Sequence, residues 1–164
     1  MDAQLLILDE IGLRLEGLRI LNGYRFDVEK TSIHRAKLTP FKFGDLPAIN
    51  YWPTPDTLAG KQNGMENREL NITIEGYSVT RDVPFTDLAI KLGNDIITTL
   101  FRSTALPKVT DPLSPALGGL IEQLSIDSIT PMIVEGQQSW VGVLVEITAS
   151  YNITVGTFSA ITKY

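Results

Sequence analysis

Two spacings of apolar residues along the chain predict its helices and strands. At residues 2–22 and again at residues 84–102, apolar side chains recur every three or four positions, which predicts two amphipathic helices. Gly23 follows the first of them, where a glycine typically ends a helix. The helical positions are Leu8, Ile11, Leu15 and Leu18 in the first stretch, and Leu88, Leu92, Ile96 and Leu100 in the second.

Strict alternation of apolar and polar residues predicts strands elsewhere, and it is most regular between residues 141 and 155. Every odd position there is apolar. A strand of that length measures roughly 50 Å at about 3.4 Å per residue, whereas most strands are about 17–20 Å long. We therefore expect this strand to extend beyond the body of one domain. Further strands are expected at residues 24–28 (continuing after a bulge through 33–38), 46–52, 70–80 and 124–134.

Two segments lack such periodicity. Residues 53–68 hold two prolines, two glycines and few apolar side chains, which predicts a long loop. Residues 103–123 hold three prolines and a Gly-Gly pair, but also several leucines. They are too apolar to stay in solvent, so we expect an irregular arm that packs on its own domain or on a neighbour. Both segments are expected to be flexible or to form interfaces.

The order of elements predicts one domain of α+β class spanning residues 1–164. Because short links join most strands, we expect a mainly antiparallel or mixed sheet of four to five strands, with two amphipathic helices packed on one face. Long strands at a sheet edge favour pairing with another chain. An oligomer formed by extension of the sheet is therefore expected.

Composition excludes several kinds of site. The chain has no cysteine, which excludes disulfides, thiol nucleophiles and cysteine-bound zinc. Its one histidine, His34, excludes a metal site with two imidazoles. No phosphate-binding loop occurs, and no apolar run approaches the roughly 18 residues of a membrane span. We expect no catalytic residues, no metal, no cofactor and no membrane contact.

The charge distribution favours protein partners. The net charge is −5, yet residues 25–42 carry five basic and two acidic groups. A specific nucleic-acid-binding protein would show a broad basic face, which this sequence lacks. A small basic segment on an acidic protein is typical of complementary protein contacts, although many such runs are only solvated.

Aromatic residues near turns suggest where those contacts lie. Phe41 and Phe43 accompany the basic segment, Trp52 precedes the predicted loop, and Trp140 opens the long strand. Such side chains either anchor interfaces or seal the ends of a core. The candidate interface with another subunit or a partner protein comprises Lys30, Arg35, Lys37, Phe41, Lys42, Phe43, Trp52, Trp140, Val141, Val143, Val145, Ile147 and Tyr151.

The whole pattern resembles one family, the tail terminator proteins of tailed bacteriophages, which are related to the minor tail protein U group. The resemblance lies in the order of elements and in five stretches: GYRFDVEK, LPAINYW, LNITIEGY, FTDLAIKLGNDIITTLF and WVGVLVEITASYNITV. It covers nearly the whole chain, and residues 103–123 are its least similar part.

The resemblance implies a structural protein of the virion, assembled in the host cytoplasm. Six copies would form a ring that caps the tail tube, stops its polymerisation and joins it to the neck or head connector. The implied partners are other copies of the chain, the tail tube protein and a connector protein, with no catalysis or cofactor. Genomic DNA would pass through the lumen without specific binding, and an acidic lumen would repel its phosphates.

Three alternatives stay open at this point. In the first, the chain is another head–tail joining component, such as a neck or stopper subunit. In the second, it is a small hydrolase that uses His34 with a nearby carboxylate. In the third, it is a monomeric module that binds acidic proteins through residues 30–43.

Overall fold

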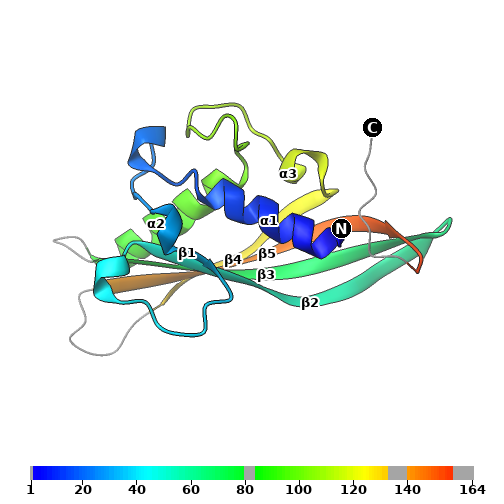
Figure 1. Cartoon of the computed structure of the whole chain (residues 1–164), viewed down its shortest axis with the longest axis horizontal. Coiled ribbons are helices and arrows are strands. Elements are labelled where there is room, and N and C mark those ends of the chain that lie inside the picture. The colour runs from blue at the N-terminus through cyan, green and yellow to red at the C-terminus, as the bar shows by residue number, and fades with distance from the viewer. Residues whose placement is uncertain (1, 80–83, 133–139, 157–164) are drawn as a thin grey trace.

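The protein consists of one sheet with helices on one of its faces (Figure 1). The structure, a computed structural model, describes residues 2–79, 84–132 and 140–156. Among these, no helix is long and apolar enough to span a membrane. The elements are α1 (Ala3–Leu15), η1 (Ile20–Asn22), η2 (Lys30–Ser32), β1 (Ile33–Arg35), η3 (Phe43–Asp45), β2 (Ala48–Gln62), β3 (Met65–Val79), α2 (Phe85–Leu100), α3 (Ala116–Gly119), β4 (Gln123–Met132) and β5 (Trp140–Thr154).

The five described strands form one mixed sheet in the order β1-β2-β3-β5-β4. The short β1 runs parallel to β2, and the other neighbours are antiparallel. The α+β class expected from the sequence is confirmed. The central pair β3–β5 keeps one register from Met65 opposite Thr154 to Val79 opposite Trp140.

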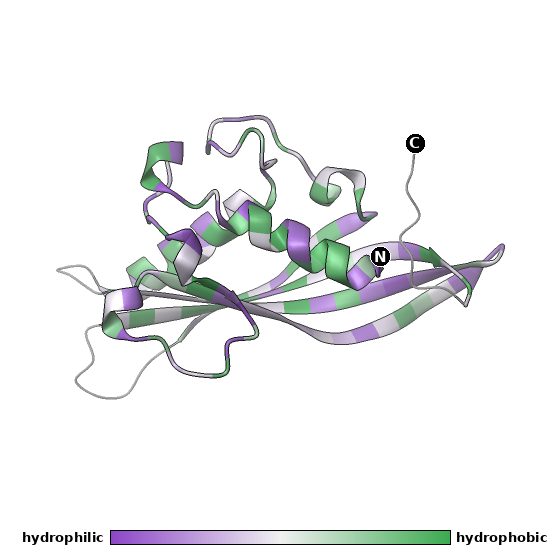
Figure 2. Ribbon diagram, in the orientation of Figure 1, coloured by the Kyte–Doolittle hydropathy of each residue, from purple (hydrophilic) through white to green (hydrophobic). Residues whose placement is uncertain are grey.

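The core lies between the sheet and the two helices. The odd residues of β5 point into it, and Val143 and Val145 are fully buried. Figure 2 shows the resulting alternation of apolar and polar residues along the strands. The helix α2 approaches the sheet closely, because a Cβ atom on Gly93 would lie only 2.8 Å from a methyl carbon of Ile129.

The buried cation Arg14 joins α1 to the segments beside it. Its guanidinium donates hydrogen bonds to the carbonyl oxygens of Leu100 and Ser114, both at 2.7 Å, and to the carboxylate of Glu10.

The first helix is shorter than the sequence predicts, since α1 ends at Leu15. A separate turn, η1, follows and is closed by Gly23 with a φ of +91°.

The strand predicted at residues 24–28 is wrong. Tyr24, Phe26 and Val28 are buried, as their alternation indicated. However, the backbone N–H of Val28 donates to the carbonyl of Leu18, and that of Arg25 to the carboxylate of Asp95. The segment is extended along the helices, outside the sheet, and the strand predicted at 33–38 is reduced to β1.

The loop predicted at residues 53–68 is also wrong, because these residues form the outer half of a long β2–β3 hairpin. Asn63 and Gly64 make its two-residue turn with φ values of +50° and +75°. Asn-Gly is the favoured pair for such a turn. Pro53 is tolerated for two reasons. Among the described strands, β1 pairs with β2 only as far as Tyr51, so Pro53 lies on an unpaired edge. The register of β2 with β3 also shifts between Pro53 and Asp56.

The arm at residues 103–123 packs on its own domain. The N–H of Val109 donates to the carbonyl of Asn22, and Leu117 is only 3% exposed. The Gly-Gly pair lies in a left-handed turn, since φ is positive from Ala116 to Gly119. The strand predicted at 124–134 is confirmed as far as Met132, and its last two residues lie outside the described part of the chain.

Candidate functional site

The face of the sheet turned away from the helices is the largest candidate surface. It presents the even positions of β5 and the odd positions of β3, so that Thr73 lies opposite Glu146 in the register. We call this the open face. Its carboxylates make no ion pair within the described residues. They are Glu69 and Glu75 on β3, Asp127 on β4 and Glu146 on β5.

Hydroxyl groups hold two of these carboxylates in place. Thr148 donates to Asp127 at 2.6 Å, and Ser128 donates to Glu146 at 3.0 Å. Both donors are neutral, so the negative charge of the face is not compensated locally. The open face therefore combines flat β-structure with uncompensated negative charge.

Four aromatic rings line up at one end of the open face. The ring centroids of His34 and Phe41 lie 5.5 Å apart, those of Phe41 and Tyr77 lie 5.8 Å apart, and those of Tyr77 and Trp140 lie 5.3 Å apart. Phe41, Tyr77 and Trp140 border a pocket of about 780 Å³, which we call the aromatic pocket. Its volume falls in the range of about 300–1,000 Å³ that is typical of ligand sites. Leu38, Phe43, Leu46 and Glu75 also line it.

Residues 36–47 form the outer wall of the aromatic pocket. The side chain of Asn50 fixes the start of this segment, since it accepts from the N–H of Lys37 at 2.8 Å and donates to its carbonyl at 3.2 Å. Ser32 fixes the other end by donating to the carbonyl of Asp45 at 2.9 Å. The wall is thus held by buried polar groups of β2 and η2.

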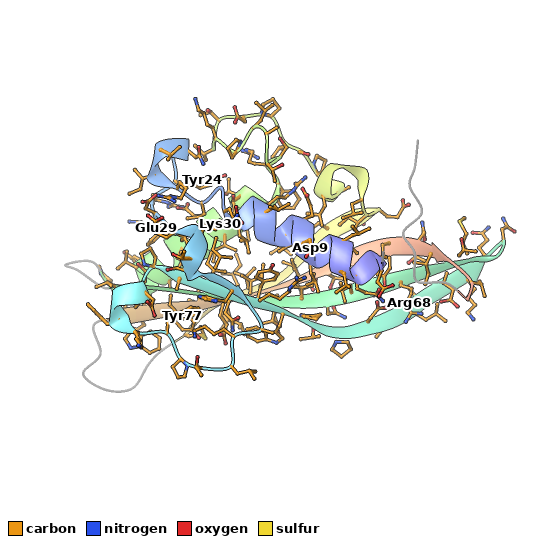
Figure 3. All side chains as sticks on the ribbon, viewed as in Figure 1. Asp9, Tyr24, Glu29, Lys30, Arg68 and Tyr77 are labelled. Carbon is orange, nitrogen blue, oxygen red and sulfur yellow. The ribbon has the colours of Figure 1, made fainter. Side chains whose placement is uncertain are left out.

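The pocket contains one carboxylate and one ammonium group. Glu75 accepts a hydrogen bond from the Tyr77 hydroxyl at 3.0 Å, and burial together with this negative neighbour raises the pKa of Tyr77. The Nζ of Lys37 lies 5.6 Å from the centroid of Phe41 and donates to Thr39 at 2.7 Å. Figure 3 places Tyr77 near this end of the sheet.

The residues predicted from the sequence as one interface do not form one surface. Lys37, Phe41, Phe43 and Trp140 line the aromatic pocket. Trp52 lies on the same face, opposite Thr73 in the register, and Lys42 is exposed on the pocket wall. In contrast, Lys30 pairs with Glu16 at 3.2 Å and Arg35 pairs with Asp9 at 3.0 Å, which turns both toward the helices.

The other predicted interface residues are corrected to core residues. Val141, Val143, Val145, Ile147 and Tyr151 are at most 1% exposed, because α1 and α2 cover that face of β5. Their alternation signalled burial within the chain, so they are not available for a contact with another subunit.

The structure reveals a polar cluster that the sequence reasoning missed. Asp56 on β2 accepts hydrogen bonds from Arg68 at 2.8 Å, from Gln4 at 2.9 Å and from the hydroxyl of Tyr151. Burial and this contact raise the pKa of Tyr151. Figure 3 shows Arg68 near the start of α1. The Asn-Gly pair at 63–64 was the signal that would have predicted the hairpin and hence this cluster.

Metal ligation and the surroundings of His34 can be described for the residues that the structure covers. No group of three or more histidine, aspartate or glutamate side chains is placed to hold a metal there. The ring of His34 packs against Phe41, and no ion pair between His34 and a carboxylate occurs in that part of the chain. The candidate site comprises two surfaces, the open face and the aromatic pocket.

Comparison with known proteins adds no assignment. No protein-family model matches the chain, and no curated protein is significantly similar to it.

Proposed function

We propose that this chain is a structural subunit of a phage tail, a terminator that closes into a six-membered ring on the end of the tail tube. The observation that carries the proposal is the open face, a long sheet surface that no described helix covers and that bears uncompensated carboxylates. An acidic, uncovered face of this kind suits the inner wall of a ring that must let a polyanion pass without binding it.

In the proposed ring the open face lines the lumen and the helices lie outside. Glu69, Glu146 and Asp127 then repel DNA phosphates, which keeps the passing DNA from binding. Repulsion between exposed charges weakens as salt rises, with a screening length of about 10 Å at 0.1 M. The repulsion between the lumen wall and DNA therefore acts over a short range, and its effect is to keep DNA from binding to the wall.

The first experiment measures the molar mass by light scattering over a range of concentrations, with negative-stain images of the same sample. Six copies of the 18.1 kDa chain in a ring with a central hole support the proposal. A monomer that also fails to bind the ends of purified tail tubes overturns it. Binding to assembled necks without binding to tubes would instead make the chain another head–tail joining component.

A charge-reversal variant tests the lumen assignment. Glu69→Lys with Glu146→Lys changes two open-face charges away from the aromatic pocket, and Asp2→Lys with Asp87→Lys changes two exposed acidic residues at the starts of α1 and α2, outside that face. We expect both proteins to assemble alike and only the first to retain short DNA in the ring at low salt. Equal DNA retention by the two variants would contradict the assignment.

A further inference from the structure

The two ends of the molecule differ in shape and chemistry. At one end, residues 58–65 form the tip of the β2–β3 hairpin, which projects beyond the helices (Figure 1). At the other end lies the aromatic pocket, close to the last residues of β3. Met65 begins β3 and Tyr77 lies near its end, so the length of that strand separates the two features.

The hairpin tip exposes apolar side chains. Leu58 is 48% exposed and Met65 is 42% exposed, and Val155, whose N–H donates to the carbonyl of Gly64, is 46% exposed. Lys61 is the one charged residue between positions 58 and 65, and its Nζ pairs with the carboxylate of Glu66 at 3.2 Å. The tip is a narrow, apolar projection, and within the described residues its exposed apolar side chains are not covered by the rest of the domain.

The aromatic pocket offers an apolar surface that complements the apolar hairpin tip. Its walls are aromatic, and two of its apolar lining residues remain accessible, Leu38 at 97% and Phe43 at 60%. Glu75 supplies a negative charge that no described cation pairs with. The pocket's own cation, Lys37, is already engaged by Thr39 and by the ring of Phe41.

We propose that the hairpin tip of one copy inserts into the aromatic pocket of the next copy. This inference rests on the ring proposed above and names the contact that would build it. Leu58 and Met65 pack against the aromatic walls, and Lys61, whose side chain is 56% exposed in its pair with Glu66, exchanges that carboxylate for Glu75 of the pocket. A tip and a pocket at opposite ends form a head-to-tail contact, and head-to-tail contacts generate closed rings when the rotation closes.

The absence of cysteine from the chain allows a clean cross-linking test. One variant, the tip–pocket variant, carries Leu38→Cys at the pocket and Gln62→Cys at the tip, and it is treated with a short bis-maleimide. Because the two sites lie at opposite ends, a link between them joins two copies. We expect a ladder of covalent oligomers on a denaturing gel, from two copies up to six.

A matched control variant carries Leu113→Cys with Gln62→Cys. Leu113 is 67% exposed and is not among the residues that line the pocket. It belongs to the arm of residues 103–123, which lies on the helix side of the sheet (Figure 1). It should give no ladder beyond the dimers that each single-cysteine protein forms. An equally strong ladder from both variants would overturn the proposal, because it would reflect random encounters.

The remaining outcomes separate this inference from the proposed function. A ring seen by light scattering, with no ladder from the tip–pocket variant, contradicts the tip-in-pocket contact and leaves the ring intact. A chain that stays monomeric without a ladder contradicts the contact, and tube capping then decides the function. A ladder formed only after a tail tube or neck protein is added would assign the pocket to that partner and would also overturn the proposal.

A second pair of variants tests the contact without cross-linking. Met65→Asp places a charge on the exposed tip, where it should not disturb folding, and should shift the protein from ring to monomer at the same concentration. Leu113→Asp makes the same change at an exposed site elsewhere and should keep the ring. A Met65→Asp protein that retains the ring, with unchanged melting temperature, would overturn the proposal.

Discussion

The strand β3 is stabilised in two different ways along its length. Under the helices, its inner face is apolar and packs against α2, as the buried Ile74 shows. In its outer half, the same face turns polar, and Arg68 and Glu66 form ion pairs with Asp56 and Lys61 of β2. The comparison teaches that a sheet can continue past its covering helices when charged pairs replace the apolar contacts.

A charge in the helix-covered half should have the largest effect. Val145→Lys buries an unpaired ammonium in a fully buried position and should cost about 4 kcal/mol or more of unfolding free energy, enough to unfold the domain. The adjacent Glu146→Lys changes the open face and should stay within about 0.5 kcal/mol. Urea denaturation of both proteins measures the difference, and similar losses would show that the two faces are not distinct.

The buried cation of the covered half should rank second. Arg14→Leu leaves the carbonyl oxygens of Leu100 and Ser114 without their donor, and breaking a buried charged contact of this kind costs about 3–5 kcal/mol. Arg19→Leu removes a partly exposed pair with Asp27 and should have a much smaller effect, because solvent screens such pairs. If a denaturant titration showed that Arg14→Leu and Arg19→Leu lower the free energy of unfolding equally, the contacts of Arg14 would be no stronger than a partly exposed ion pair.

The outer half should respond more weakly and more locally. Asp56→Ala removes the acceptor shared by Gln4, Arg68 and Tyr151 and should cost about 1–3 kcal/mol. Amide hydrogen exchange should accelerate in the outer hairpin and stay slow in α2. Thr57→Ala, which alters the opposite face of the same strand, is the control. Faster exchange throughout the molecule would mean that the two halves unfold as one unit.

The smallest effect should be a dependence on pH in the outer half. Hydrogen bonds from Lys61 and Arg68 lower the pKa of Glu66 from its ordinary value of 4.5. A carboxyl with a lowered pKa in the folded state stabilises the protein above 4.5, and that stabilisation disappears as the pH falls through the folded pKa. The melting temperature of the wild type should exceed that of Glu66→Gln at pH 7, and the gap should shrink as the pH falls below 4.5. A difference in melting temperature that grows as the pH falls would contradict the predicted direction of the pH dependence.

The helix-covered half is also the half that sequence patterns predict well. The alternation from Val141 onward correctly indicates a long strand, and the spacing from Leu88 to Leu100 correctly indicates α2. Both patterns arise because one face is buried in a shared core. The extended segment containing Phe26 shows the limit, since burial produces the same alternation where hydrogen bonds run to Leu18 and Asp95 instead of to a strand.

The outer half and the pocket were harder to predict for physical reasons. Charged pairs such as Asp56–Arg68 replace apolar contacts in the hairpin, so the alternation that marks a strand is lost there. The aromatic pocket depends on distant residues, because Phe41, Tyr77 and Trp140 meet only once the sheet has formed. Of the predicted interface residues, the aromatic ones were informative, and the valines of β5 reported burial alone.

The unbroken register of β3 and β5 has a mechanical consequence. The hydrogen bonds of an antiparallel pair run perpendicular to the strands. A pull along the strands, such as one applied at the hairpin tip, therefore shears all of these bonds at once instead of opening them one after another. Force entering at Met65 is spread along the whole ladder to Val79, so the projecting hairpin can carry tension into the body without fraying.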